Sequence, residues 1–169
     1  MSETKEPLEI ERKYTIKDLP KDLDSYQKKF IEQTYLTTDP VIRVRREDDT
    51  YYMTYKGSGG MIHTEYNLPL TEEAYLTLKQ NAQGNVITKT RYLLPIASPR
   101  FRDGFVPADG LSLTVELDVF EAPFAPLIIA EVEFPDAETA DAYLPETWFL
   151  EEVTGDKNYS NASMSRRKF

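Results

Sequence analysis

The sequence predicts an α+β protein built on a closed, eight-stranded antiparallel β-barrel, a tunnel with a charged lumen that a few helices flank. Three observations support this fold class. About eight short strand-like runs, separated by turn residues, follow one another along the 169 residues. Polar and apolar residues alternate within each run, so each strand has two unlike faces. The polar faces are charged, and the sign of the charge changes along the chain.

The strand-like runs are short and closely spaced, which favours antiparallel pairing. Breaks typical of turns occur at Asp39-Pro40, at Asp48-Asp49 and at 58–60, and a loop with Pro and Gly covers 98–110. The runs read LEIERKYTI, IEQTYLTT, VIRVRRE, TYYMTYKG, MIHTEYNLPL, VITKTRYLLPI, LSLTVELDVF and LIIAEVEFP.

Helices are expected between and after these runs. Residues 20–30 are predicted to form a short helix that Pro20 opens. Residues 71–82 start with Thr71, a good N-cap, and two acids follow it, which suits the helix dipole. Residues 136–144 have a helical pattern, and short helical pieces are expected beyond Pro145.

The composition fits a single domain, 1–169, in a reducing compartment. A net charge of −9 does not attract nucleic acid or an anionic membrane. The sequence has no cysteine, which excludes disulfides and thiolate metal sites. The N-terminus lacks the apolar stretch of a secretory signal, and the longest apolar run, 127–130, is too short to cross a bilayer. We therefore expect a cytoplasmic protein.

The charged rows on the strands separate by sign. The first row has two acids and then a base, the middle rows are mainly basic, and the last two rows are acidic pairs. The solvated face of an ordinary sheet is the alternative explanation, but such a face usually mixes signs within a strand. The bases are Lys13, Arg43, Arg45, Lys56, Lys89 and Arg91, and the acids are Glu9, Glu11, Glu65, Glu116, Asp118, Glu131 and Glu133.

A barrel that closed with these rows inward would have a narrow lumen lined by opposed charges. Burying so many charges is unfavourable unless they are paired or hold an ion. The acids would form an oxygen cage suited to Mg²⁺ or Mn²⁺. The bases would grip a chain of phosphates, with arginine binding two oxygens at once. Together the rows predict a site for a metal–polyphosphate complex.

The run EIERK at 9–13 resembles the ExExK signature of the CYTH superfamily, the triphosphate tunnel metalloenzymes. This family includes class IV adenylyl cyclases, thiamine triphosphatases and inorganic triphosphatases. The resemblance continues in family order along nearly the whole chain, and the wording of EIERKY, QTYLTT, ELDVF and EVEF is most similar to bacterial inorganic triphosphatases. The further matching stretches are IRVRR, TYKG, TEYN, TKTRY, ELDVF, EVEF and GDKNYSN.

The resemblance implies a metal-dependent triphosphatase that splits tripolyphosphate into pyrophosphate and phosphate, with Mg²⁺ or Mn²⁺ as cofactor. The implied catalytic residues are Glu9, Glu11 and Lys13, and either Glu9 or Glu11 would help to polarise the attacking water. The implied triphosphate-binding residues are Lys13, Arg43, Arg45, Lys56, Lys89, Arg91 and Lys157. The implied metal ligands are Glu9, Glu11, Glu116, Asp118, Glu131 and Glu133. Glu116 and Asp118 would hold a metal-bound water or orient the cationic side chains.

Other functions stay open at this point. A class IV adenylyl cyclase or a thiamine triphosphatase would use the same tunnel with an added pocket for the organic group, and no stretch of the sequence indicates such a pocket. A non-catalytic polyphosphate- or nucleotide-binding module is the third reading, although it would not need so many carboxylates. The expected partner is a small-molecule triphosphate, and a homodimer is an option because related proteins often form one.

A few single residues are assigned from strand parity. His63 shares the parity of Glu65, but we expect it at the surface or at a loop edge. Tyr35 is expected to point inward with Gln33. The outward-facing tyrosines are expected to pack beneath helices; they are Tyr51, Tyr55, Tyr66 and Tyr92.

Overall fold

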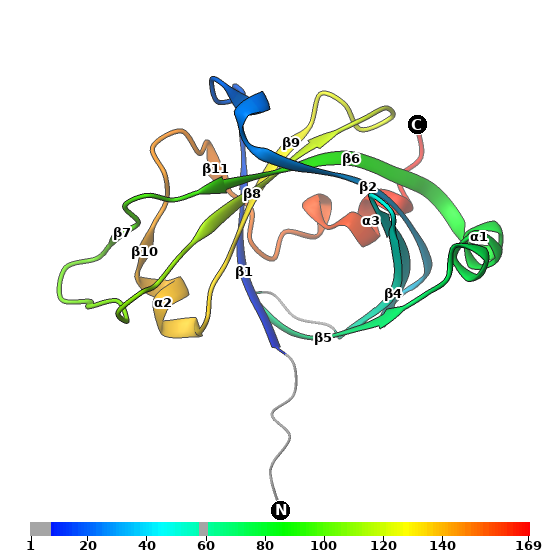
Figure 1. Cartoon of the computed structure of the whole chain (residues 1–169), viewed down its shortest axis with the longest axis horizontal. Coiled ribbons are helices and arrows are strands. Elements are labelled where there is room, and N and C mark those ends of the chain that lie inside the picture. Colours follow the sequence, from blue (N-terminus) through cyan, green and yellow to red (C-terminus); the bar gives the residue numbers. More distant parts are fainter. Residues whose placement is uncertain (1–7, 58–60) are drawn as a thin grey trace, which may run out of the picture.

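Eight antiparallel strands close into a barrel, as the sequence predicts. The computed structural model describes residues 8–57 and 61–169, so the predicted break at 58–60 lies outside the described residues. The last strand of the series pairs back onto the first and closes the barrel. In order around the wall, the strands are β1 (Leu8–Thr15), β5 (Ile62–Pro69), β4 (Thr50–Lys56), β3 (Val41–Glu47), β2 (Gln27–Thr38), β6 (Gln83–Pro95), β8 (Thr114–Phe120) and β9 (Ile128–Glu133) (Figure 1).

Short elements surround the barrel. α1 and α2 form where the sequence predicts them, with Thr71 and Asp136 as side-chain N-caps. Among the described residues, no helix is long and apolar enough to cross a bilayer. The remaining elements are η1 (Leu23–Ser25), α1 (Glu72–Asn81), β7 (Arg100–Phe101), α2 (Ala137–Ala142), β10 (Tyr143–Leu144), β11 (Glu151–Glu152), η2 (Lys157–Tyr159) and α3 (Asn161–Ser165).

The predicted helix over 20–30 is wrong. Only one 3-10 turn, η1, forms there, none of its residues is buried, and β2 already begins at Gln27. The first residues of β2 pair with β6, where Gln27 lies opposite Leu93. Leu23, Tyr26 and Phe30 do recur at helical spacing, but the backbone ladder with β6 overrides this local pattern.

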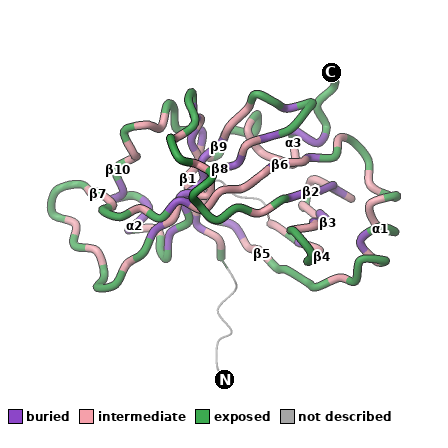
Figure 2. The backbone as a smooth tube through the Cα atoms, turned by 45° about the horizontal axis from the view of Figure 1, so that its top comes forward, coloured by how far each residue is buried: buried purple, intermediate pink, exposed green. Residues whose placement is uncertain are grey.

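The main hydrophobic core lies outside the barrel wall. It lies between the outer faces of β1, β8 and β9 and the segment that carries α2 and β10, and Figure 2 shows buried backbone concentrated there. Tyr14 stacks on Phe149 with ring centroids 4.5 Å apart. Arg12, also facing outward, ties this side together by donating to the carbonyls of Ala140 and Tyr143 at 2.9 and 2.8 Å. Apolar packing on the outside therefore leaves the inside free for charge.

A second, smaller core closes one end of the barrel from within. α3 lies inside the barrel outline in Figure 1, and its Met164 packs against inward-facing apolar residues of β2, β6, β8 and β9. Those residues are Tyr35, Ile87, Phe120 and Ile129. The Asn85 side chain donates to the carbonyls of Met164 and Arg167 at 3.1 and 2.7 Å, which ties β6 to the end of the chain. The end of the chain thus forms a plug.

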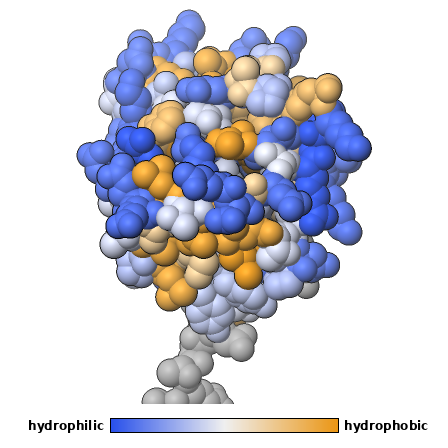
Figure 3. Space-filling view, turned by 90° about the vertical axis from the view of Figure 1, so that its right-hand side faces the viewer, coloured by the Kyte–Doolittle hydropathy of each residue, from blue (hydrophilic) through white to orange (hydrophobic). Residues whose placement is uncertain are grey.

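The outward tyrosines are only partly covered by helices. Tyr51 packs on Tyr75 of α1 with ring centroids 5.2 Å apart, as predicted. Tyr55 and Tyr66 contact each other but are 42% and 43% exposed, so the prediction is wrong for this pair. Figure 3 views the side of the molecule that carries α1 and shows apolar residues gathered on its lower part. α1 is ten residues long, too short to cover the outer faces of both β4 and β5.

Gly84 allows the close approach of α3 to β6, which gives a test of the plug. Its φ is +88°, and a Cβ at this position would lie 2.2 Å from the Ser165 carbonyl oxygen. We expect Gly84→Ala to lower the free energy of unfolding by about 1–2 kcal/mol for the left-handed backbone, plus roughly 1–3 kcal/mol for the displaced helix. Urea denaturation measures the loss.

Gly104 is the matched control, because its φ is +86° and nothing lies within 4 Å of a Cβ there. Gly104→Ala should therefore show the backbone cost alone. Equal losses in the two variants would mean that α3 does not rest on Gly84.

Candidate active site in the charged tunnel

Strand parity places the charged rows inside the barrel. A polar cavity of about 190 Å³ lies there, lined by side chains from seven of the eight strands and by Asn161 of α3. Its wall has seven carboxylates and five cationic side chains, so the lining is negative overall. A polyanion could enter only together with additional cations. The lining residues are Glu9, Glu11, Lys13, Arg43, Arg45, Glu47, Tyr52, Lys56, Glu65, Arg91, Glu116, Glu131, Glu133 and Asn161.

Arg43 and Arg45 of β3 form the basic wall of the tunnel. β3 is four strands from β9 in either direction around the barrel, so these guanidinium groups face the acids of β9 across the lumen. Both arginines are buried, at 7% and 6% exposed. Arg45 Nε donates to Gln33 Oε1 at 2.8 Å, and burial together with the charge of Arg43 lowers the pKa of Arg45. Two buried like charges side by side attract an anion.

Arg43 has unused hydrogen-bonding capacity. Its Nε is buried without a hydrogen-bond partner, and no carboxylate in the described part of the chain forms an ion pair with it. An unsatisfied buried donor on a permanent cation is costly unless a ligand satisfies it. The two-pronged guanidinium is suited to bind two phosphate oxygens.

The acidic wall is built by β1, β8 and β9. The register of β1 and β9 places Glu11 opposite Glu133 and Lys13 opposite Glu131. Lys13 Nζ lies 3.0 Å from Glu131 and 3.9 Å from Glu11. Burial would raise the pKa of Glu131, but Lys13 and Arg91 outweigh it and hold that pKa well below its usual range.

At three carboxyl groups of this wall, the nearby bases do not offset the effect of burial and of the neighbouring acids. Burial and the neighbouring Glu131 raise the pKa of Glu11. Burial and the acids around them also raise the pKa of Glu116 and of Glu133. Raised pKa values mean that burial and the neighbouring acids together outweigh the nearby bases, so the charged form of these carboxyl groups is disfavoured. Carboxylate oxygens outnumber the bases here, and hard divalent cations prefer such oxygen ligands.

Arg91, Asp118 and Lys89 form a buried ion cluster below the acidic wall. Arg91 donates to Asp118 at 2.7 and 2.8 Å and to Glu131 at 2.7 Å, and it also bonds Glu116. Lys89 Nζ lies 2.5 Å from Asp118, and neither side chain lines the tunnel cavity. Burial lowers the pKa of Lys89 to about 8. These cations are occupied by carboxylates and hold the acidic wall in place.

Glu9, His63, Glu65 and Lys56 meet on the wall formed by β1, β5 and β4. His63 lies opposite Glu9 in the β1–β5 register, and Glu65 lies opposite Lys56 in the β4–β5 register. His63 is 6% exposed and its Nε2 bonds Glu9, so the expectation of a surface histidine is wrong. Burial would raise the pKa of Glu9, but His63 and Lys56 outweigh it and lower that pKa.

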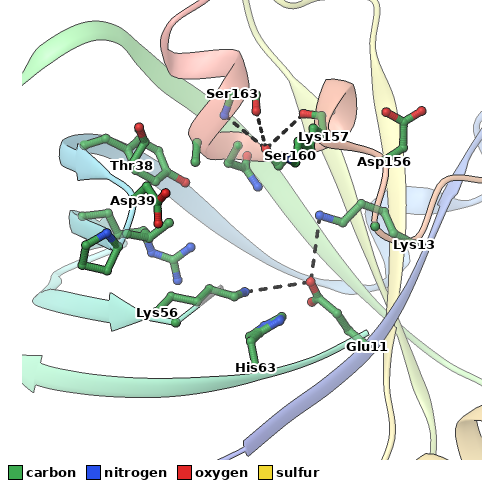
Figure 4. Close-up of a pocket in the computed structure, with 18 of the residues that line it drawn as sticks. Glu11, Lys13, Thr38, Asp39, Lys56, His63, Asp156, Lys157, Ser160 and Ser163 are labelled. Atoms are coloured by element: carbon green, nitrogen blue, oxygen red, sulfur yellow. Dashed lines mark hydrogen bonds and ion pairs between the residues drawn. The ribbon is translucent and has the colours of Figure 1, made fainter. Parts of the chain in front are cut away.

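A second cavity of about 420 Å³ adjoins the charged one at the plugged end. The two cavities share Glu11, Lys13, Arg43, Lys56 and Asn161, so they lie side by side. In Figure 4, Lys13 and Lys56 approach Glu11 from two sides, and Nζ of each lies 3.9 Å from Glu11 Oε1. Lys157 of η2 lines this cavity with residues of α3.

The sequence-predicted residues therefore separate into groups. Ten of them line the charged cavity, Lys157 lines the adjoining one, and Lys89 and Asp118 lie beneath the wall. The ten are Glu9, Glu11, Lys13, Arg43, Arg45, Lys56, Arg91, Glu116, Glu131 and Glu133.

Some lining residues were missed as site residues. Glu47 shares the parity of Arg45, and Tyr52 shares that of Lys56, so both signals were present in the sequence. Tyr52 was hidden in a run with three tyrosines that gives no other sign of its inward face. Asn161 comes from α3, and only the folding of the chain end into the barrel places it here. Gln33 and Tyr35 point inward as expected and hydrogen-bond each other.

Known proteins share this architecture. The sequence model of the CYTH domain matches residues 7–167. An inorganic triphosphatase from Nitrosomonas europaea is 35% identical over 161 residues, which cover 93% of this chain and 96% of that protein. An inorganic triphosphatase from Acetivibrio thermocellus is 32% identical, with 95% of each chain covered. The crystal structure of an inorganic triphosphatase superposes with a TM-score of 0.64 at 32% identity, covering 95% of each chain.

The excess of acid predicts an unusual response to pH. Because the pKa of Glu11 is raised on folding, the cation-free protein loses stability as pH rises from about 4.5 through the folded pKa. In the presence of a chelator, Glu11→Gln should therefore be more stable than the wild type at pH 7, and the difference should shrink at lower pH. Urea denaturation at a series of pH values measures this.

Glu32, outside the barrel, is the control, because folding shifts its pKa in the opposite direction to that of Glu11. Burial would raise its pKa, but hydrogen bonds from Lys79 and Tyr75 outweigh that effect and lower the pKa. Glu32→Gln should destabilise at pH 7, with the effect lost as pH falls through the folded pKa of Glu32. A Glu11→Gln variant that loses stability like Glu32→Gln would contradict the assignment of excess negative charge.

Proposed function

This chain belongs to the CYTH domain family, and we propose that it is a divalent-metal-dependent hydrolase of linear triphosphates, with inorganic tripolyphosphate as the favoured substrate. The observation that carries the proposal is the buried basic wall of β3 facing the under-compensated carboxylates of β1 and β9 across one lumen. The relatives named as inorganic triphosphatases, matched over nearly their full length, support the same activity.

The triphosphate binds along the basic wall. Arg43 offers a buried Nε with no other partner, and Arg45 is held in place by Gln33 and by Tyr52, whose hydroxyl lies 3.2 Å from Arg45 Nη1. Lys56 is the third cation, at the border between the basic and acidic walls. The charge of these groups neutralises the phosphate oxygens, including the negative charge that develops on the leaving pyrophosphate.

The acidic wall fits the divalent cation that the family implies. The carboxylates that line the tunnel outnumber its bases, and on neighbouring β5 the Oε2 atom of Glu65 is buried without a hydrogen-bond partner. Mg²⁺ or Mn²⁺ would be held by Glu9, Glu11, Glu131 and Glu133, with Glu116 supporting them. When bound, the cation would neutralise phosphate charge and acidify a water molecule.

The reaction is a displacement at a terminal phosphorus. The oxygen of water forms the new P–O bond, the anhydride P–O bond breaks, and pyrophosphate leaves with the bonding electrons. Glu9 and Glu11, adjacent on the inner face of β1, orient the water opposite the basic wall. Lys13 keeps Glu11 and Glu131 together by contacting both carboxylates. Asp118, Lys89 and Arg91 act as positioning residues beneath this wall.

A substrate with an organic group is the second candidate. The 420 Å³ cavity adjoins the charged lumen, and Tyr35 and Val41 line it beside Lys157 and Ser160. A nucleoside or thiamine triphosphate would place its organic end there. We keep such substrates as the alternative, because the polar groups of this cavity do not form a set that matches the hydrogen-bonding edge of a nucleobase.

Release of phosphate from tripolyphosphate, ATP and thiamine triphosphate tests the proposal, with Mg²⁺ or Mn²⁺ present. We expect tripolyphosphate to be the fastest substrate. Arg43→Ala should reduce its turnover by about 10²- to 10³-fold, because a preorganised donor to the transition state is lost. Arg43→Lys should lose less, since it keeps the charge but not the two-pronged geometry. Glu11→Gln should abolish turnover.

Glu138→Gln is the control, because this carboxylate is exposed on α2 outside the barrel. It should turn over tripolyphosphate like the wild type. Cyclic AMP formed from ATP would instead identify a cyclase. Tight triphosphate binding without release from any substrate would identify a binding module.

Other properties stay predictions from the sequence. A single domain over 1–169, a cytoplasmic location in keeping with the absence of cysteine, and a homodimer are all untested expectations. The expected partner is the small-molecule triphosphate itself.

A further inference from the structure

His63 brings an imidazole nitrogen, which can bind a metal, beside the carboxylates of β1 and β5. One ligand atom each from Glu9, His63 and Glu65 lie within 4.8 Å of one another, close enough to contact one ion together. The strand register fixes this group: His63 lies opposite Glu9, and Glu65 follows two residues later on the same face of β5. His63 is buried, so its imidazole has little freedom to leave the cluster.

Glu65 is already oriented for a ligand. Thr54 Oγ1 donates to Asn67 Oδ1 at 2.6 Å, and Asn67 Nδ2 donates to Glu65 Oε1 at 3.0 Å. These two hydrogen bonds hold one carboxylate oxygen of Glu65 in place. The other oxygen, Oε2, is buried without a hydrogen-bond partner. A hydrogen-bonded outer shell that fixes one oxygen and presents the second is the usual support of a metal-binding carboxylate.

Lys56 currently supplies the positive charge of this cluster. Its Nζ lies 2.5 Å from Glu9 Oε2 and 3.7 Å from Glu65 Oε2. A lysine head group on a flexible stem can move away when a doubly charged ion takes over that charge. Its release would direct Lys56 toward the phosphates, so cation and triphosphate would support each other's binding.

We propose that Glu9, His63 and Glu65 form a metal site with His63 as a direct ligand, and that this site selects a first-row transition-metal dication such as Mn²⁺ over Mg²⁺. This inference rests on the proposed function, because the site shares Glu9 with the carboxylates that are proposed to hold a cation in the same tunnel. Imidazole suits transition metals, and carboxylates suit Mn²⁺ as well as Mg²⁺. Mg²⁺ sheds its water reluctantly and prefers oxygen ligands, so the nitrogen favours the transition metal.

The composition makes the ligand identifiable. The chain has one histidine and no cysteine. Any imidazole nitrogen found on a bound metal therefore comes from His63, provided that the protein carries no added histidine tag.

Pulsed electron paramagnetic resonance of untagged protein loaded with Mn²⁺ alone is the test. We expect a nitrogen coupling from a directly bound imidazole, and the coupling should change when isotope-labelled histidine is incorporated. Titration calorimetry should show tighter binding of Mn²⁺ than of Mg²⁺. Mn²⁺ bound with no nitrogen coupling would overturn the proposal, whatever the variants do.

Variants give a second readout that does not depend on turnover. His63→Gln and Glu65→Gln should each weaken Mn²⁺ binding by at least about tenfold. His63→Gln should also reduce the ratio of the Mn²⁺ affinity to the Mg²⁺ affinity. Glu47→Gln is the matched control, because Glu47 lines the same tunnel but is bound to Lys29 at 2.6 Å and to Tyr52 at 2.8 Å. It should bind Mn²⁺ like the wild type. Equal weakening in all three would indicate a general charge effect and contradict a defined site.

Failure of this proposal is distinguishable from failure of the proposed function. Triphosphate hydrolysis without a nitrogen coupling would leave the triphosphatase standing and remove His63 from the metal site. A nitrogen coupling without hydrolysis of any triphosphate would leave the metal site standing and remove the proposed reaction.

Discussion

The burial of opposed charges inside a closed barrel is the constraint on which the rest of this structure depends. Each inward row of a strand must be neutralised within the lumen, because buried ions lose their hydration. The cluster of Arg91, Asp118 and Lys89 meets much of this requirement, because Asp118 forms short ion pairs with both bases and Arg91 also binds Glu131. Arg43 and Glu11 do not, since one lacks a partner and the other has a raised pKa. The unbalanced groups lie where ligands of both signs are expected.

This use of the interior moves the apolar packing elsewhere. The larger core lies against the outer faces of β1, β8 and β9, where α2 and the chain around Trp148 cover it. The smaller core lies at one end of the lumen, where Met164 of α3 blocks the barrel. Stability thus comes from outside the wall and from the plug, and the charged middle of the tunnel is preserved for chemistry. The excess carboxylates cost stability until cations bind them.

Much of the barrel and its lining could be predicted because strand parity is a strict rule. Once Glu11 faces inward, Lys13 must as well, and the same rule places Arg43 with Arg45. Parity gives the face of a residue but not its depth or its partners, so it could not show that Lys89 is sealed against Asp118. Register between β1 and β5, which brings His63 to Glu9, is decided by long-range pairing. The same holds for Gln27, where pairing with β6 replaced the expected helix.

We predict that the tunnel accepts a triphosphate only as a complex with divalent cations, because its lining has more carboxylates than bases. The most direct measurement is calorimetric titration with a triphosphate analogue whose bridging oxygens are replaced by methylene groups, so that hydrolysis does not interfere. With Mg²⁺ or Mn²⁺ present we predict tight binding at one site, and with a chelator present we predict little or none. Equal affinity under both conditions would contradict the claim, since the bases alone would then suffice.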